Sequence, residues 1–166
     1  MNIIDWDPAK GDLCQGDVVL FRIPDRLKLD TGDEAKPRDH RLILAKGELT
    51  GHHHAIWNPQ PAMFRDDGLA RELLRSQGVP DDGATAAKLS EAKAGARLYR
   101  DPEAVRVLIG QGELAHNRLA IGFLVVEGGP VVLRHDEHDA VRIPPGRYYV
   151  GGQSEWDAAE ERRVAD

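Results

Sequence analysis

The last third of the chain is a succession of short apolar segments, each closed by a tight turn. From Leu119 onward the sequence reads LAIGFLVV, EGGP, VVLRH, DE, HDAVRI, PPG and RYYVGGQ. Short runs rich in valine, isoleucine and tyrosine, bounded by glycine and proline, are typical of β-strands. This succession predicts a β-meander that forms part of a small β-barrel or β-sandwich, in a mainly β protein.

Two stretches nearer the N-terminus have the same character. QGDVVLFRIP (15–24) opens with a Gly-Asp turn and stops at a proline, which predicts one strand. HRLILAKGELTGHHHAIW (40–57) predicts one or two strands that bend near Lys46-Gly47. The charged segment between them, 25–39, predicts a loop or a ragged hairpin arm.

The middle of the chain differs from this β framework. Asp66 or Asp67 can cap a helix, and an alanine-rich segment at 83–95 predicts a second short helix or a mobile segment. We therefore expect a helical insertion at about 61–95 within one domain, 1–166, for which a jelly roll is one of the arrangements left open. We also expect a short C-terminal helix after Trp156, because acidic residues precede basic ones there.

One segment has conflicting signals. Asp101-Pro102-Glu103 resembles a helix start, since an aspartate cap and a proline in the first turn both favour helix. The β-branched VRVLI that follows favours a strand. The sequence leaves both readings open.

Composition limits the classes of function. The chain has 166 residues, a net charge of −6 and one cysteine, which excludes an intramolecular disulfide and a multi-cysteine zinc site. The absence of any clustered Lys/Arg block disfavours nucleic acid as the partner, and no apolar run is long enough to cross a membrane. The N-terminal MNIIDWDPAKGD lacks the regions of a signal peptide, so we expect a cytoplasmic location.

The triplet at 52–54 is the first group with metal-binding chemistry. On a strand, side chains alternate between faces, so His52 and His54 point one way and His53 the other. A His-x-His pair on one face is a natural unit for binding a metal ion. The face of His53 also carries Leu49, Ala55 and Trp57, which predicts that this face is packed.

A second histidine pair lies in RHDEHD (134–139). A two-residue turn at Asp136-Glu137 would make His135 and His138 cross-strand neighbours, with Cβ atoms about 5 Å apart. Because Asp-Glu is not a favoured pair for such turns, a slightly wider loop is the alternative. Either turn keeps both imidazoles at one hairpin tip.

Together the two pairs predict a metal site. His52, His54, His135 and His138 would bind one divalent ion, for which Zn²⁺, Fe²⁺, Ni²⁺ and Mn²⁺ all remain open. If the site is catalytic, the metal would activate a water or a substrate oxygen, with Glu137 or Glu48 as the proton acceptor. The alternative is a solvated histidine-rich strand without a ligand.

The arrangement is similar to cupin-like metal sites, in which a His-x-His strand and a later histidine share an ion inside a β-barrel. A cupin's first motif normally carries a glutamate a few residues further on. Here that stretch reads AIWNPQ, which has none.

Several phrases also resemble an uncharacterised group of small bacterial proteins. These phrases are QGDVVLF, GELTGHHH, RHDEH with RIPPGRYYV and QSEW, and the closing ERRVAD. The group's G-H-x-H motif corresponds to His52 and His54, and its H-x-E-H motif corresponds to His135, Glu137 and His138; P-P-G-x-Y and R-R-V-x-D complete the pattern. The resemblance implies that the two histidine motifs form one site, but it implies no particular reaction.

Two other functions stay open. The chain could be a non-catalytic structural or interaction protein, such as a phage- or operon-encoded assembly component that forms a homo-oligomer or binds a protein partner. It could also be a barrel that binds a small anionic ligand through the histidines and Tyr148 or Tyr149. Alternation along that strand predicts that one tyrosine is in the core and the other is exposed or lines a pocket.

Overall fold

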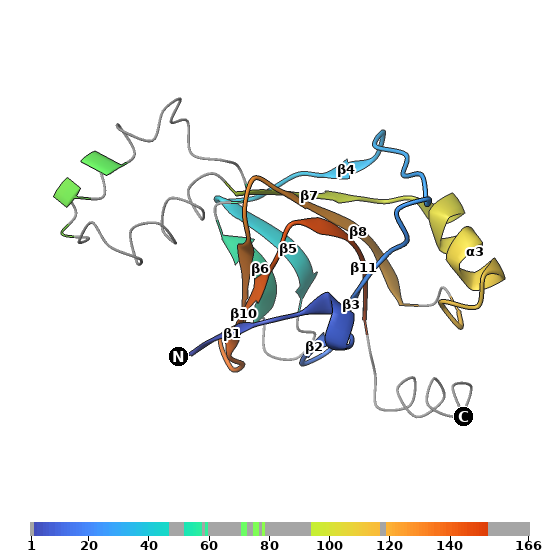
Figure 1. The fold of residues 1–166 in the computed structure, drawn as a ribbon, viewed down its shortest axis with the longest axis horizontal. Helices are drawn as coiled ribbons and strands as arrows, with labels where there is room; N and C mark the ends of the chain where they lie inside the picture. Colours follow the sequence, from blue (N-terminus) through green and yellow to red (C-terminus); the bar gives the residue numbers. More distant parts are fainter. Residues whose placement is uncertain are drawn as a thin grey trace.

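The computed structural model describes residues 2–46, 52–57, 59, 71, 72, 75, 76, 78, 94–116 and 119–152. This part of the chain is mainly β-structure, built from two sheets and the helix α3 (Figure 1). The strands are β1 (Ile3–Asp5), β2 (Leu13–Gln15), β3 (Val18–Arg22), β4 (Glu34–Ala35), β5 (Arg41–Lys46), β6 (His53–Trp57), β7 (Gly95–Tyr99), β8 (Ala120–Glu127), β9 (Val131–Arg134), β10 (Ala140–Ile143) and β11 (Gly146–Gly152). The helices are the 3-10 helix η1 (Pro8–Lys10) and α3 (Pro102–Gly110).

The strands form two separate sheets. Sheet A has the order β1-β10-β9-β6-β5, and sheet B has the order β2-β3-β11-β8-β7-β4. All neighbouring strands are antiparallel except β1 and β10, which are parallel. The described strands do not close into a barrel, because each sheet keeps two edge strands.

The main hydrophobic core lies between the two sheets. In β3, Val18 and Leu20 point into this core and are fully buried, while Val19 and Phe21 point to the other face. This alternation is the period-2 pattern expected for a strand. Tyr148 of β11 is also fully buried, and its hydroxyl donates to the carbonyl oxygen of Pro144 at 2.5 Å, which satisfies its only donor.

A second, smaller core lies between the opposite face of sheet B and helix α3 (Figure 1). Phe123 and Tyr149 of the sheet belong to this core together with Val105 and Leu108 of the helix. The conflict in this segment is therefore resolved in favour of the helix. Asp101 caps α3 by accepting from the backbone N–H of Ala104 at 3.1 Å, and this cap with the following proline outweighs the β propensity of VRVLI.

The expected C-terminal strands all form, but the expected meander is wrong. β8 pairs with β7 and β11, whereas β9 pairs with β6 and β10, so the chain crosses from sheet B to sheet A between β8 and β9. The sequence does not reveal this crossing, because a strand has the same alternation of apolar and polar residues whichever of the two sheets it belongs to.

Most of the expected helical insertion lies outside the described residues, as does the expected C-terminal helix. Within it, residues 71, 72, 75 and 76 are helical, and the segment ends where β7 begins at Gly95. None of the helices in the described part of the chain is both long and apolar enough to cross a lipid bilayer.

Candidate functional site

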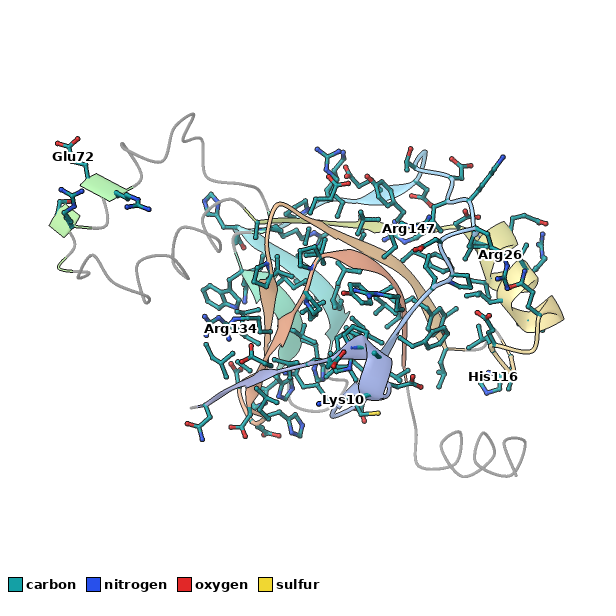
Figure 2. All side chains as sticks on the ribbon, in the orientation of Figure 1. Lys10, Arg26, Glu72, His116, Arg134 and Arg147 are labelled. Carbon is teal, nitrogen blue, oxygen red and sulfur yellow. The ribbon has the colours of Figure 1, made fainter. Side chains whose placement is uncertain are left out.

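Four histidines, from β6 and the residue before it and from the loop after β9, meet at one end of sheet A. His52 and His54 lie at the start of β6, and His135 and His138 lie in the loop between β9 and β10. β6 and β9 are hydrogen-bonded neighbours, with Ala55 opposite Arg134 (labelled in Figure 2), so the sheet itself brings the two pairs together. The structure thus brings together four residues that are spread over more than half of the chain.

The rings are close neighbours. The ring centroids of His54 and His135 are 4.1 Å apart, with the planes inclined by 27°. His138 lies 4.7 Å from His135 and 6.2 Å from His54, and His52 lies 5.9 Å from His135. His135 is therefore the central member of the cluster.

The cluster runs from the protein interior to the surface. His54 and His135 are buried, with exposed fractions of 3% and 8%. The side chain of His52 is 32% exposed, and His138 is exposed. A small ligand or ion can thus reach the inner rings from solvent along the outer ones.

Gln15 fixes the protonation pattern of His54. The Gln15 amide nitrogen donates to the carbonyl oxygens of Leu133 at 3.2 Å and Asp139 at 2.9 Å, so the amide oxygen must face His54. That oxygen lies 2.8 Å from Nδ1 of His54. A neutral His54 ring therefore carries its proton on Nδ1, and Nε2 keeps a free lone pair.

Gly16 forms a backbone wall against the same rings. It has a φ of +56°, a left-handed conformation that glycine adopts without strain. A Cβ atom at this position would lie 2.8 Å from Nε2 of His138 and 3.1 Å from Cε1 of His54. The absence of a side chain at Gly16 therefore leaves room for both imidazoles.

His135 has the opposite proton arrangement. Its Nδ1 accepts a hydrogen bond from the backbone N–H of Glu137 at 3.1 Å. The proton of a neutral His135 ring is therefore on Nε2. The two buried imidazoles are thus held in different tautomers by different partners.

His52 lies between two carboxylates. Its Nδ1 is 3.3 Å from Oε1 of Glu137, and its Nε2 is 3.8 Å from Oδ2 of Asp136. Both carboxylates are mostly exposed, so these contacts are weak in water. They connect the start of β6 to the tip of the β9–β10 loop.

Burial keeps the inner imidazoles neutral. The pKa of His54 is lowered from 6.5 to about 4, first because the ring is buried and then because it faces His135 and His138; Asp17 opposes the shift. Burial also lowers the pKa of His135, with His138 acting in the same direction and Glu137 opposing. A neutral imidazole is the form that binds a metal ion.

The structure corrects two details of the expected site. The register pairs Leu133 with Val141, and the strands end at Arg134 and resume at Ala140, so the turn is a five-residue loop, which is the wider alternative rather than the two-residue turn. The rings of His135 and His138 meet because the loop folds back, not because they are opposed across strands. The unfavourable Asp-Glu pair is the physical reason for the wider loop.

The packing expected for the His53 face of β6 is found only in part, because Ala55 on that face is buried but Trp57 is exposed. His54 shares its face with Ile56, which points into the main core, whereas Trp57 on the opposite face is 54% exposed. The His52 and His54 face is thus the inner one. Glu48, the second expected proton acceptor, lies outside the described residues.

Neither tyrosine is exposed. Tyr148 and Tyr149 are both buried, on opposite faces of sheet B, because both faces of this sheet are covered. Tyr149 lines a cavity of about 490 Å³ beside His116 and Asp12, which agrees with the pocket expected for one of the two. This cavity does not include the four histidines.

Gln15 and Gly16 are the functional residues that sequence reasoning missed. Their only signal is the QGD turn that precedes β3, which reads as ordinary turn chemistry. They reach the cluster because β2, which carries Gln15, belongs to sheet B and faces the histidines of sheet A.

The arrangement is not a preformed metal cage. Among the residues that the structure describes, no three or more His, Cys, Asp or Glu side chains are placed so that they could hold a metal ion. The stacked rings of His54 and His135 explain this, since near-parallel imidazoles direct their nitrogen lone pairs side by side rather than toward one point.

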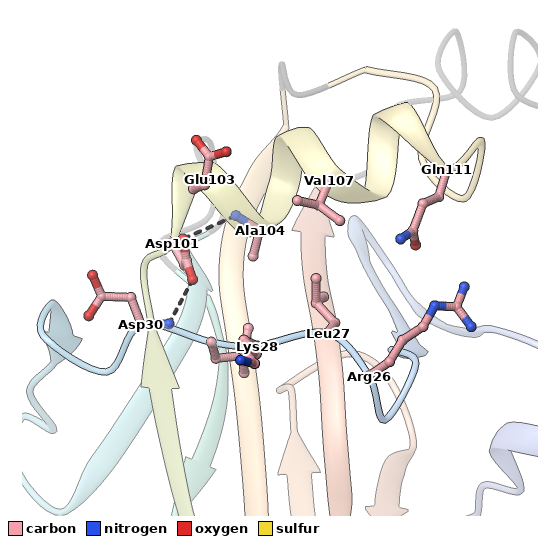
Figure 3. Close-up of a pocket in the computed structure, with 10 residues that line it drawn as sticks. Arg26, Leu27, Lys28, Asp30, Asp101, Glu103, Ala104, Val107 and Gln111 are labelled. Atoms are coloured by element: carbon pink, nitrogen blue, oxygen red, sulfur yellow. Dashed lines mark hydrogen bonds between the residues drawn. The ribbon is translucent and has the colours of Figure 1, made fainter.

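A cavity of about 630 Å³ lies elsewhere, between α3 and the segment 26–30 (Figure 3). Its buried carboxylate, Asp101, is already engaged: it accepts from the backbone N–H groups of Ala104 and Asp30, as the dashed lines in Figure 3 show. The groups around this cavity therefore hold the helix in place and offer little unsatisfied chemistry.

The chain belongs to the family described as Domain of unknown function (DUF8820), whose model matches residues 14–99. The matched region contains Gln15, Gly16, His52 and His54 but ends before His135 and His138. Comparison with curated proteins found no match, and neither did comparison with solved structures.

Proposed function

We propose that this member of the DUF8820 family binds one divalent transition-metal ion through His54, His135 and His138, with His52 as the outermost ligand. The observation that carries the proposal is the buried His54, whose Nδ1 is bound to Gln15 and whose Nε2 therefore keeps its lone pair when the ring is neutral. Metal-binding histidines typically hold their second nitrogen in this way. Because the pKa of His54 is lowered, the ring is unprotonated at neutral pH, and protons compete little with the metal ion for its nitrogen.

Binding requires a local rearrangement at the loop. Nε2 of His135 carries a proton while Nδ1 accepts from the backbone N–H of Glu137. The imidazole of His135 must therefore turn about its side-chain bonds, or bind through Nδ1 after releasing that N–H. Residues 136–139 of the loop are exposed, so they can move without disturbing the core. The ion would be Zn²⁺, Fe²⁺ or Ni²⁺ rather than Mn²⁺, because imidazoles suit the first three better.

The fold supports the same proposal at a coarser level. Two facing sheets with histidines on an inner strand and on a later loop fit a β-sandwich of the jelly-roll or cupin-like kind. Cupin-like sites also collect histidines on the inner face of such sheets. If the ion activates a water, Glu137 is the proton acceptor closest to the cluster, at 3.3 Å from His52. Glu48 remains a second prediction for this role.

Elemental analysis of tag-free protein tests the proposal. The protein is equilibrated with Zn²⁺, Ni²⁺ or Fe²⁺, desalted, and analysed for bound metal per chain. We expect about one ion per chain for the wild type. We expect His54→Gln to lower the affinity at least tenfold, since glutamine keeps a hydrogen-bonding group beside Gln15 but supplies no imidazole lone pair.

His53→Gln is the matched control, because His53 lies in the same triplet but on the opposite face of β6. It should bind metal as the wild type does. A wild-type stoichiometry near zero would contradict the proposal, as would equal binding by the His53 and His54 variants. Either result would favour the alternative, a non-catalytic interaction protein that binds a second copy of the chain or another protein.

A further inference from the structure

A cavity of about 490 Å³ opens between the edge strands of the two sheets, and none of the four histidines is among the residues that line it. β5 is the last strand of sheet A, and β4 is the last strand of sheet B, so among the described strands neither has a neighbour on its outer side. The cavity lies along these two edges and is lined by residues of β4, β5, β7 and β8.

The inner part of this cavity is apolar. Ala35, Ala45 and Ile121 line it, and all three are only partly buried while packing against the main core. Beneath them, Leu42 and Leu98 are buried core residues that also line the cavity. An apolar group placed here would bury the exposed parts of these side chains, which is favourable by about 25 cal/mol per Å².

The rim of the cavity is cationic, in a protein whose net charge is −6. Two of its four basic residues are neutralised: Lys36 lies 3.0 Å from Glu34, and Arg100 lies 3.3 Å from Asp33. The other two are Arg38 and Arg41. Within the described part of the chain, neither guanidinium has a carboxylate within ion-pair distance.

Arg38 and Arg41 are held by a strained turn. The backbone groups of the two residues exchange hydrogen bonds of 2.9 Å in both directions, around Asp39 and His40. Both central residues have left-handed φ values, 50° and 61°, as in a type I′ hairpin. Non-glycine residues adopt this conformation only at a cost in free energy, and such strain is concentrated at binding sites.

Arg41 is further positioned by an aromatic ring. Its guanidinium lies 5.4 Å from the centroid of Trp57, within the range of a cation–π contact. Arg38 and Arg41 thus both line the cavity, and the guanidinium of Arg41 also contacts the exposed indole of Trp57 on the outer face of sheet A. Guanidinium groups suit carboxylates and phosphates because they donate paired hydrogen bonds.

We propose that this cavity binds a small organic anion, with the carboxylate or phosphate head between Arg38 and Arg41 and a short apolar body against Ala35, Ala45 and Ile121. The volume lies in the range of small-molecule sites. The proposal is independent of the metal site, since it uses none of the four histidines.

Isothermal titration of the full-length, chelator-treated protein tests this. The titrants are octanoate, octyl phosphate, octylamine and inorganic phosphate. The three alkyl compounds are used below their critical micelle concentrations. We expect saturable binding of octanoate, octyl phosphate or both, and at least tenfold weaker binding of octylamine and of inorganic phosphate. The stronger of the two alkyl anions identifies the head group.

Variants locate the site. Arg38→Gln combined with Arg41→Gln should lower the affinity for the alkyl anion at least tenfold. Arg26→Gln, an exposed arginine beside the cavity under α3, is the matched control and should bind as the wild type does. His54→Gln should also bind the anion normally, which separates this result from any failure of the metal proposal.

Three outcomes would overturn the inference. The first is no saturable binding of either alkyl anion. The second is equal binding of octylamine, which would indicate apolar partition without recognition of charge. The third is unchanged affinity in the arginine double variant, provided that its far-ultraviolet circular dichroism matches that of the wild type. An Ile121→Asp variant gives a further check, because its carboxylate would repel the anion from within the cavity.

Discussion

Nδ1 of His54 and the amide oxygen of Gln15 lie 2.8 Å apart, and this hydrogen bond joins strand β6 of sheet A to strand β2 of sheet B. Gln15 also donates to two backbone carbonyls, so its amide has no freedom to reverse. One neutral side chain thus determines which nitrogen of a buried imidazole is free. The consequences for metal binding and for stability can be measured separately.

Gln15→Met should lower the metal affinity of the folded protein about tenfold. Methionine matches the length of glutamine but cannot accept from Nδ1 of His54, so the ring can turn or change tautomer. Loss of such an outer-sphere partner typically lowers metal affinity about 10- to 100-fold. Competition with a chromophoric chelator, well below the unfolding temperature, measures the change.

Gln111→Met is the control for this substitution. Gln111 caps the C-terminal end of helix α3 and lines the cavity under it, which includes none of the four histidines (Figure 3). Its variant should keep the wild-type affinity for metal. If Gln15→Met lowers the free energy of unfolding but leaves the metal affinity unchanged, Gln15 only stabilises the packing of the two sheets and does not orient a metal ligand.

Gly16→Ala should weaken metal binding and destabilise the fold. The new methyl group would lie 2.8 Å from Nε2 of His138 and must displace that ring. The left-handed φ of +56° adds about 1 kcal/mol of backbone strain. Urea denaturation and the chelator competition measure the two effects.

Gly112→Ala is the control that separates backbone strain from the steric contact with His138. Gly112 also has a positive φ, 75°, but a Cβ there would meet no atom within 4 Å. It should therefore lose stability through strain alone and bind metal normally. Equal metal affinity in the Gly16 and Gly112 variants would show that His138 is not a ligand.

The strands within 15–24, 40–57 and the segment from Leu119 onward, and the four histidines, could be predicted because their signals are local. Alternation along HHHAIW separates His52 and His54 from His53, and tight turns mark the ends of the C-terminal strands. The pairing of β8 with β11 and of β9 with β6 could not be predicted, because it depends on contacts distant in sequence. Short strands such as β4, with two residues, have no periodicity to detect.

Local signals also misled in one place. GARLY follows an alanine-rich run that ends in glycine, which is typical of a helix end, yet Gly95 begins strand β7. Gln15 carries no motif at all, and its role appears only when sheet B places it against sheet A. The sequence therefore predicted the imidazoles of the site, while the groups that orient them depend on tertiary packing.

Asp101→Ala should destabilise the protein by about 2–3 kcal/mol. Its carboxylate accepts from the backbone N–H of Ala104, as the cap of α3, and from that of Asp30, and alanine leaves both donors unsatisfied. Asp101→Asn should cost less, since its one amide oxygen can still cap the helix. Thermal unfolding measures both variants. Glu103→Gln, exposed on the same helix, should change little, and a loss equal to that of Asp101→Ala would contradict the capping role.

Metal-free protein should lose stability between pH 7 and pH 5 because of His54. Its pKa in the folded protein is about 4, below the ordinary 6.5, so between these values the unfolded chain binds the proton more tightly than the folded protein does. Acidification therefore favours unfolding, and the loss grows as the pH falls and levels off below the folded pKa. For a shift of this size the loss from His54 is about 2 kcal/mol between pH 7 and pH 5.

His54→Gln should remove this part of the pH dependence, because glutamine does not titrate in this range. His53→Gln should keep it, since His54 is intact in that variant. Urea titrations at several pH values, in the presence of a chelator, measure the free energy of unfolding for all three proteins. If the His54 variant retains the full slope of stability against pH, the buried imidazole is not the group that the acid must protonate.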